Sequence, residues 1–258
     1  MASRPVALVT GGARRIGRAI GLHLAAHGWD VALHFHGSSA DADSAVAQAR
    51  AAGAQAHALQ ADLRDASAAE ALVGAAVAHF GRLDAVVNNA SAFEYDDVAS
   101  FGPDRLGRHM AVNATAPVVL ARALHAHLGA RGARGAEGCV VNLLDQQLWN
   151  PNPDYFSYTL SKAALQSATT MLAMALAPVL RVCAVAPGLT LGSELIDDAM
   201  LERLKTTSLL GRAVDVADIA QAVHFLLSNR SVTGSTLMVD AGFHLVRAER
   251  DFPFQDAP

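Results

Sequence analysis

The sequence VALVTGGARRIG, at residues 6–17, decides the fold of this chain. Its first four residues, Val6–Val9, form a short apolar run of strand character, and a glycine pair follows at Gly11 and Gly12. The next segment, Arg14–His27, has helical character. A buried strand that leads directly into a helix begins a strand–helix–strand unit, so we expect a parallel sheet.

The same alternation continues along the 258-residue chain. Apolar runs predict seven strands, at residues 6–9, 29–35, 55–59, 84–87, 139–143, 179–185 and 236–239. We expect helices at residues 14–27, 40–52, 67–80, 103–127, 155–176 and 215–227. Pro117 should kink or break the long helix, and Asp215 should cap the last one. Right-handed crossovers then give an α/β fold, a single doubly wound Rossmann domain over residues 1–258, whose seven-stranded parallel sheet carries helices on both faces.

Composition excludes several classes of function. Apolar residues make up 52% of the chain, and the net charge of −4 gives no general attraction to nucleic acid or to an anionic membrane. No apolar run is long enough to span a bilayer and no signal peptide is recognisable, so we expect a cytoplasmic protein. Cys139 and Cys183 lie in apolar strands and should be reduced core residues. The glycine-rich stretch 129–138 predicts a solvent loop.

The glycine-rich turn after the first strand predicts a phosphate-binding loop. Gly11 can adopt backbone angles that other residues avoid, and Gly17 lets the first helix pack closely on the sheet. Free N–H groups at the start of that helix suit a pyrophosphate. We therefore predict a bound dinucleotide, with contacts from Gly11, Arg14, Arg15, Ile16 and Gly17.

The end of the second strand bears on the choice between NAD and NADP. The segment 33–39 (LHFHGSS) contains no carboxylate that could accept a hydrogen bond from the ribose 2′-hydroxyl. The guanidinium groups of Arg14 and Arg15 suit a 2′-phosphate, which favours NADPH, although both side chains could instead only face solvent. His34 and His36 are two residues apart, but without nearby cysteine or carboxylate ligands we expect no metal site there.

Tyr158 and Lys162 are the candidate catalytic pair. They lie four residues apart, which places the phenol and the ammonium on one face of a helix. A nearby cation favours the phenolate, so we expect a lowered pKa for Tyr158 and a role as general acid. Such a pair also occurs by chance on solvent-facing helices, so the surrounding motifs matter.

With Asn88-Asn-Ala90, Asn113 and Pro187-Gly188 in the same order, the chain resembles the classical short-chain dehydrogenase/reductases over residues 5–245. The resemblance implies that Tyr158 transfers the proton, that Lys162 also binds the nicotinamide ribose and that Asn113 supports a water relay to Lys162. It further implies a homotetramer packed partly through the helices of Asn113 and Tyr158. Its additional cofactor contacts would be Asp62, Leu63, Asn89, Ala90, Pro187 and Gly188.

Asp145 departs from the general pattern of that family, which has a serine thirteen residues before the tyrosine. An ionised carboxylate only accepts hydrogen bonds and would repel a developing alkoxide. It could accept N–H donors from a heterocycle such as an aminopyrimidine or, when protonated, donate to a ring nitrogen. The alternative is that Asp145 marks degenerate catalysis.

Within the family, an aspartate at this position resembles the pteridine reductases. The segment 33–38 resembles their cofactor-phosphate segment, with His36 and Ser38 as contacts, although Gly37 stands where an arginine is usual. The segment 89–93 resembles one in which a serine, here Ser91, contacts both pterin and cofactor, and a phenylalanine, here Phe93, stacks on the pterin ring. The alternative for Phe93 is an ordinary loop hydrophobe.

These observations predict an NADPH-dependent oxidoreductase that transfers a hydride to a C=N or C=O bond of a small flat heterocycle, with Asp145, Tyr158, Ser91 and Phe93 at the substrate. Two alternatives stay open: a reductase of small ketones, sugars or 3-oxoacyl substrates, and a redox-inactive NADP-binding sensor or scaffold.

Residues 189–209 should form a substrate lid. Its apolar residues would form either a wall of the site or ordinary helix contacts: Leu191, Leu195, Ile196 and Met200. The tail 247–258 orders over a site or at a subunit contact, or it frays.

Overall fold

The computed structural model describes residues 4–132, 137–192 and 195–254, and these residues gather around a seven-stranded sheet. The strands are β1 Val6–Val9, β2 Asp30–Phe35, β3 Ala56–Gln60, β4 Ala85–Asn88, β5 Gly138–Leu143, β6 Leu180–Pro187 and β7 Thr236–Val239. Their spatial order is β3-β2-β1-β4-β5-β6-β7, and every neighbouring pair is parallel. The predicted doubly wound Rossmann fold is therefore confirmed, while the assignment of residues 1–258 to one domain stays a prediction.

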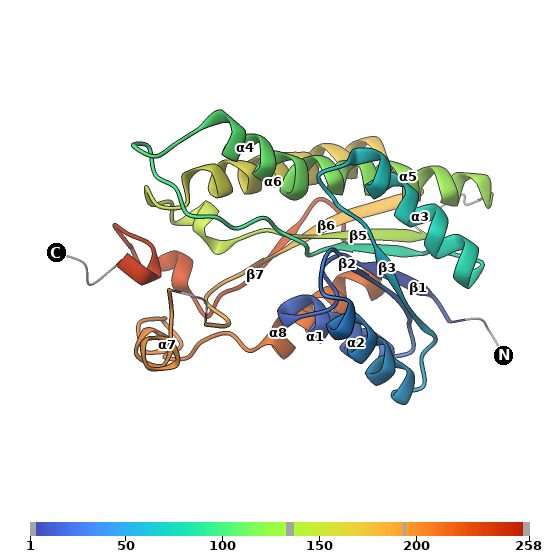
Figure 1. Cartoon of the computed structure of the whole chain (residues 1–258), viewed down its shortest axis with the longest axis horizontal. Coiled ribbons are helices and arrows are strands. Elements are labelled where there is room, and N and C mark those ends of the chain that lie inside the picture. The colour runs from blue at the N-terminus through green and yellow to red at the C-terminus, as the bar shows by residue number, and fades with distance from the viewer. Residues whose placement is uncertain (1–3, 133–136, 193–194, 255–258) are drawn as a thin grey trace.

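Helices cover both faces of the sheet (Figure 1). One face carries α1 Arg15–Ala26, α2 Ser39–Ala51 and α8 Val216–Ser228. The other carries α3 Ala66–Phe80, α4 Pro103–Met110, α5 Ala116–Ala130 and α6 Phe156–Ala175. The shorter α7, Asp198–Lys205, lies beside the C-terminal segment, away from the two layers (Figure 1).

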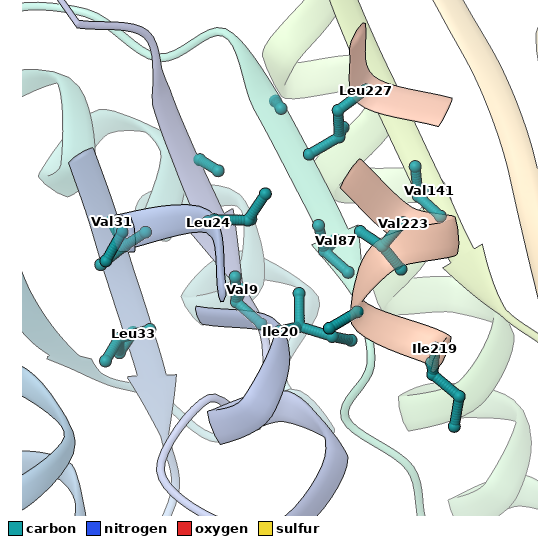
Figure 2. Close-up of a cluster of buried hydrophobic side chains, with 14 of the residues drawn as sticks. Val9, Ile20, Leu24, Val31, Leu33, Val87, Val141, Ile219, Val223 and Leu227 are labelled. Atoms are coloured by element: carbon teal, nitrogen blue, oxygen red, sulfur yellow. The ribbon is translucent and has the colours of Figure 1, made fainter. Parts of the chain in front are cut away.

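Alternation along the strands divides the core into two layers. In β1, Ala7 and Val9 belong to the buried cluster under α1 and α8, whereas Val6 and Leu8 belong to the cluster under α3 and α5. Successive side chains of a strand point to opposite faces, so a strand covered on both faces is apolar throughout. Figure 2 shows the first cluster, in which Ile20 and the other apolar side chains of α1 and α8 face the sheet.

The helix ends largely follow the predicted signals. Asp215 caps α8, as predicted, and accepts a hydrogen bond from the N–H of Ala217, while Asp218 completes a capping box. The predicted helix 103–127 is instead α4, a π-helical turn at Ala111–Thr115, and α5. Pro117 lies in the first turn of α5, which continues the helical backbone of α4 and the π-helical turn, so its missing N–H interrupts the bonding without ending the helix.

Expectations from the sequence also concern the loop before β5, the two cysteines and membrane spans. The predicted loop 129–138 is shorter, because α5 extends to Ala130 and β5 begins at Gly138; residues 133–136 lie outside the described residues. Both cysteines are buried with free thiols. Within the described part of the chain, no helix combines the length and the apolar character needed to cross a membrane.

The packing of α1 yields a prediction about its glycine. A Cβ atom at Gly17 would overlap with the carbonyl oxygen of Gly11 and the side-chain amide of Asn89, whereas one at Gly74 in α3 would meet no atom within 4 Å. We expect Gly17→Ala to cost about 1–3 kcal/mol through overpacking and to weaken NADPH binding at least roughly tenfold. The matched Gly74→Ala should gain about 0.5–1 kcal/mol from helix propensity.

Thermal unfolding and NADPH titration of both variants would check this expectation. Equal melting temperatures for the two variants would contradict the close approach at Gly17.

Candidate active site

A cavity of about 450 Å³ lies where the chain leaves the carboxyl ends of β1, β4, β5 and β6. This is the edge at which parallel α/β sheets bind ligands. Ten of the predicted site residues line this cavity: Arg15, Ile16, Asn89, Ser91, Phe93, Asp145, Tyr158, Lys162, Pro187 and Gly188. The structure therefore brings the predicted catalytic residues and part of the predicted cofactor set to one place.

The phosphate loop is held by hydrogen bonds between the segments that follow β1 and β4. Asn89 donates from its side-chain amide to the carbonyl oxygens of Thr10 and Gly11, at 2.9 and 3.3 Å. The Thr10 hydroxyl accepts from the N–H groups of Asn89 and Ala90, each at 3.0 Å. Gly11 has a φ of +63°, which a glycine adopts without strain. The loop is thus fixed before any ligand binds.

The start of α1 has the features of an anion-binding site. Arg14 is the N-cap and makes no side-chain capping bond, and the first turn contains no acidic residue. The first N–H groups of the helix and its positive dipole end therefore face the loop uncompensated. Together with the close packing of Gly17 on Gly11 and Asn89, which fixes the start of the helix beside the loop, this arrangement fits a diphosphate.

The two arginines of the loop lie apart, although both were expected to flank the ribose 2′ position. Arg14 forms an ion pair with Asp41, while Arg15 lines the cavity and donates to the carbonyl oxygen of Gly192 at 2.9 Å. Arg15 has a φ of +52°, so its backbone turns the side chain away from that of its neighbour. Of the two arginines, Arg15 is thus the one that lines the cavity.

Polar residues predicted to contact the cofactor gather at the ends of β2 and β3. The His36 ring is 3.9 Å from the carboxylate of Asp62, whose pKa falls to about 2 because Arg64 donates hydrogen bonds to it. Leu63 is buried, and Ser38 stands at the N-cap of α2 without a side-chain capping bond. His36 and Ser38 are therefore placed where a 2′-phosphate is expected.

His34 braces the phosphate loop. The N–H of Gly11 donates to its Nδ1 at 3.2 Å, so Nε2 carries the proton and donates to the carbonyl oxygen of Ala61 at 3.2 Å. Burial lowers the pKa of His34, which keeps the ring neutral in this role. Both ring nitrogens are used by the fold.

The central contact of the cavity joins Tyr158 to Asp145. The phenol donates to the carboxylate Oδ2 at 2.8 Å, and the N–H of Gln147 donates to Oδ1 at 2.9 Å. Tyr158 is 6% exposed, so the bond lies in a largely dry environment. The side chain of Asp145 is therefore oriented by two donors, one of them the phenol of Tyr158.

The expected lowering of the Tyr158 pKa is wrong for this structure. Burial raises its pKa well above the ordinary value, and the charges of Asp145 and Asp251 raise it further. The Lys162 ammonium lies 5.6 Å from the centroid of the Tyr158 ring and does not offset these effects. The phenol is consequently held protonated, as a proton donor must be.

Lys162 is positioned by the end of β5. Its Nζ donates to the carbonyl oxygen of Leu143 at 2.7 Å, and the side chain is 3% exposed. Burial lowers its pKa to about 8, although the nearby Asp145 acts in the opposite direction. Lys162 therefore offers its remaining N–H donors to the cavity.

Asn113, in the π-helical turn, joins the segment after β4 to α6. Its amide donates to the carbonyl oxygen of Ala92 and to the hydroxyl of Ser161, each at 2.9 Å. Its carbonyl oxygen accepts from the N–H of Ala92 at 2.7 Å and from the Ser91 hydroxyl at 3.2 Å. These four bonds use the full capacity of the side chain, so the relay to Lys162 stays a prediction that would have to use the backbone of Asn113.

An aromatic group lies over the Tyr158 side of the cavity. Phe93 stacks on Tyr155 with ring centroids 4.4 Å apart and meets the Tyr158 ring edge-on at 4.7 Å. Half of the Phe93 side chain, 51%, is exposed. A flat apolar face is thus presented beside the proton donor, as stacking on a planar ring requires.

The predicted lid contributes both a wall and ordinary core contacts. Leu191 and Ile196 line the cavity, and Ile196 also packs with Met200 in a cluster that includes Phe243 and Phe252. Leu195 is 50% exposed. The C-terminal part of the lid is the helix α7.

The tail, up to Phe254, lies against the site. Arg250 makes two hydrogen bonds to the buried carboxylate of Asp154, both at 2.9 Å, and the N–H of Asp251 donates to the same group at 2.8 Å. Phe254 packs on Tyr95, with ring centroids 4.9 Å apart. Residues 255–258 lie outside the described residues.

This arrangement brings a second carboxyl group, that of Asp251, to the cavity that contains Asp145. Burial raises the pKa of Asp251 to about 7, with further contributions from the charges of Asp145 and Asp154. Burial likewise raises the pKa of Asp145. Sequence patterns did not identify Asp251, because its role depends on a tail that no local motif places at the sheet edge.

Comparisons with known proteins agree with this geometry. A family model described as enoyl-(acyl carrier protein) reductase matches residues 11–244. The chain is 32% identical to pteridine reductase 1 of Leishmania tarentolae, over 95% of this chain and 98% of that protein. It is 31% identical to the 3-oxoacyl-(acyl-carrier-protein) reductase FabG of Staphylococcus aureus, over 93% of this chain and 98% of that protein.

A solved structure is similar over the same extent. FolM alternative dihydrofolate reductase 1 from Brucella canis, complexed with NADP, is 40% identical and superposes with a TM-score of 0.90. The match covers 97% of this chain and 98% of that one.

Asp251 generates a prediction about pH. The unfolded chain loses this proton near the ordinary value of 3.8, whereas the folded protein keeps it up to about pH 7, so the group's contribution to stability is lost as the pH rises through this interval. Asp251→Asn removes the titrating carboxyl group and therefore its contribution to the change of stability with pH. We expect the melting temperature of the variant, relative to the unsubstituted protein, to be on the order of 2–4 °C higher at about pH 8 than at about pH 4.5.

Asp43→Asn, at an exposed position of α2 outside the cavity, provides the control for the loss of one carboxyl group. An equal difference for Asp251→Asn at the two pH values would show that this carboxyl group titrates in the ordinary range.

Proposed function

This chain belongs to the short-chain dehydrogenase/reductase family, and we propose that it is an NADPH-dependent reductase of a small flat heterocycle, of the pteridine or dihydrofolate kind. The reduced bond is a C=N or C=O bond of that ring. Two of the similar proteins described above are named for pteridine or dihydrofolate reduction, and one of these binds NADP. The substrate class itself rests on the chemistry of the cavity.

The residues around the phosphate loop support NADPH as the reductant. The uncapped start of α1 supports a diphosphate there, and His36 and Ser38, at the end of β2 and the start of α2, would contact the 2′-phosphate. Lys162, buried beside the cavity, would hold the nicotinamide ribose, and Gly188 would approach the nicotinamide amide. When bound, NADPH supplies the hydride for the reduction.

The hydrogen bond between Asp145 and Tyr158 is the observation that carries the proposal. A carboxylate accepts but does not donate, so Asp145 suits the N–H and NH₂ groups of an aminopyrimidine ring. Phe93 offers an apolar face on which such a ring can stack. The cavity therefore offers a hydrogen-bond acceptor, Asp145, for the edge of a planar polar ring and an aromatic side chain, Phe93, for its face.

Tyr158 completes the reduction by protonation. A hydride added to the carbon of a C=N bond leaves a negative charge on the nitrogen, and the phenol donates its proton there, giving CH–NH. Lys162 lies within reach to stabilise the phenolate that forms, and Asp145 keeps the phenol oriented until that moment. Solvent then restores the proton.

The 3-oxoacyl alternative has one observation in its favour, the similarity to FabG. The alkoxide that develops from a 3-oxoacyl substrate would lie beside Asp145. The carboxylate of Asp145 only accepts hydrogen bonds, so it would oppose the negative charge of the alkoxide. The redox-inactive alternative would require that the buried Tyr158 and Lys162 serve no chemistry, although both line a cavity with phosphate-binding features beside it.

We further propose a cytoplasmic homotetramer. Large apolar side chains on the outer faces of α5 and α6 support subunit contacts there: Val118, Leu160, Met171 and Met174. Light scattering combined with size-exclusion chromatography measures the subunit number directly.

The decisive experiment is oxidation of NADPH by the purified protein with dihydrofolate, dihydrobiopterin and an acetoacetyl thioester. The proposal requires turnover of a pterin or a folate. Turnover of the thioester alone would establish the 3-oxoacyl function, and NADPH binding without turnover of a broad panel would favour the sensor.

Tyr158→Phe tests the proton donor. The variant keeps the ring and its contact with Phe93 but lacks the hydroxyl, so we expect turnover to fall at least about 100-fold, as for loss of a general acid. NADPH affinity and melting temperature should stay near those of the unsubstituted protein. Full activity in the variant would remove Tyr158 from the chemistry.

Asp145→Ser and Asp145→Asn test the acceptor. Each removes the charged partner of an aminopyrimidine, so kcat/KM for a pterin or folate should fall about 10- to 150-fold, equivalent to about 1.5–3 kcal/mol. The serine variant should meanwhile gain activity on the acetoacetyl thioester, because its hydroxyl can donate to an alkoxide. If both substrates lose activity equally, Asp145 supports the fold of the site and does not select the substrate.

A further inference from the structure

Three histidines meet on the surface between α1 and α8, away from the cavity described above. His23 and His27 are one turn apart on α1, and His224 lies on α8. The ring centroids of His23 and His27 are 4.0 Å apart. The ring centroid of His224 lies 5.4 Å from that of His23 and 5.1 Å from that of His27. The reductase mechanism uses none of these rings.

The spacing of their nitrogens approaches that of a metal site. Each ring offers one nitrogen such that all three lie within 4.8 Å of one another. Nitrogens bound tetrahedrally at about 2.0–2.1 Å from Zn²⁺ are about 3.4 Å apart. His27 is exposed and the other two rings are half-buried. Small rotations of the side chains therefore bring the nitrogens from within 4.8 Å of one another to the spacing of a zinc site.

Hydrogen bonding leaves lone pairs free in the cluster. The Nδ1 of His27 lies 2.7 Å from the carbonyl oxygen of His23. A carbonyl oxygen only accepts, so Nδ1 carries the proton and Nε2 of His27 keeps a lone pair, an arrangement typical of metal-binding histidines. The Nε2 atom of His23 is buried, and the described residues give it no hydrogen-bond partner.

The two helices form a rigid frame for the cluster. Ile20 and Leu24 of α1 and Ile219, Val223 and Leu227 of α8 are buried against the same face of the sheet (Figure 2). The positions of the two helices are therefore set by the core and not by the histidines.

We propose that His23, His27 and His224 bind a divalent transition-metal ion such as Zn²⁺. Imidazole nitrogens suit zinc, copper and nickel, and three protein ligands leave the fourth position of a tetrahedron to water. The ion would join α1 to α8. No local spacing in the sequence indicates this cluster, because His224 is far from α1 along the chain.

The test is zinc titration of tag-free protein by calorimetry, with Co²⁺ as a spectroscopic probe. We expect about one ion per chain and a melting temperature that rises with metal concentration, because the ligands come together only in the folded protein. His224→Ala should weaken binding at least about tenfold and remove the visible absorption of tetrahedral Co²⁺.

The stacked pair His57 and His79, with ring centroids 4.0 Å apart, supplies the matched control. It resembles the α1 pair but belongs to no cluster of three possible ligands among the described residues. His79→Ala should therefore leave zinc affinity unchanged. Equal affinities of the His79→Ala and His224→Ala variants, or no zinc binding, would overturn the proposal. These readouts do not depend on reductase activity.

Discussion

The close approach of the segments after β1 and β4 constrains everything at the carboxyl edge of the sheet. Asn89 bridges the carbonyl oxygens of Thr10 and Gly11, and the space beside them admits no side chain at Gly17. Because this contact fixes the start of α1, it leaves the uncapped N–H groups of that helix facing the loop. The same segment then continues to Phe93, so the phosphate binding and the substrate stacking proposed above would share one anchor.

The cavity combines groups whose charges oppose one another. Two carboxyl groups, those of Asp145 and Asp251, line it together with the phenol of Tyr158 and the ammonium of Lys162. Burial raises the pKa values of the three acids and lowers that of Lys162 to about 8, so burial shifts each of the four groups toward its neutral form. A site of this kind can exchange protons with a heterocycle near neutral pH.

Much of the fold was predictable because it depends on local patterns. The seven apolar runs gave the strands, since a strand covered on both faces must be apolar, and the capping residue Asp215 marked the start of α8. The motif around Tyr158 and Lys162 was likewise local, and the resemblance placed both residues at the cavity. The position of Pro117 indicated an interruption, although not the π-helical turn that contains Asn113.

The remaining features depend on burial and on contacts between distant segments. The predicted pKa change of Tyr158 had the wrong sign, because a sequence shows the neighbouring lysine but not the desolvation. Arg14 and Arg15 are adjacent, yet a positive φ at Arg15 separates their side chains. Asp251 and the triplet of histidines are brought into place by tertiary packing, for which no local motif exists.

The attachment of the tail by Arg250 and Asp154 gives the pocket a wall that does not come from the helix of Tyr158 and Lys162. Those two residues belong to α6, whereas Asp251, Phe252 and Pro253 reach the cavity on a segment held by the ion pair of Arg250 with Asp154. Substitutions on such a segment can change the shape of the pocket without displacing α6.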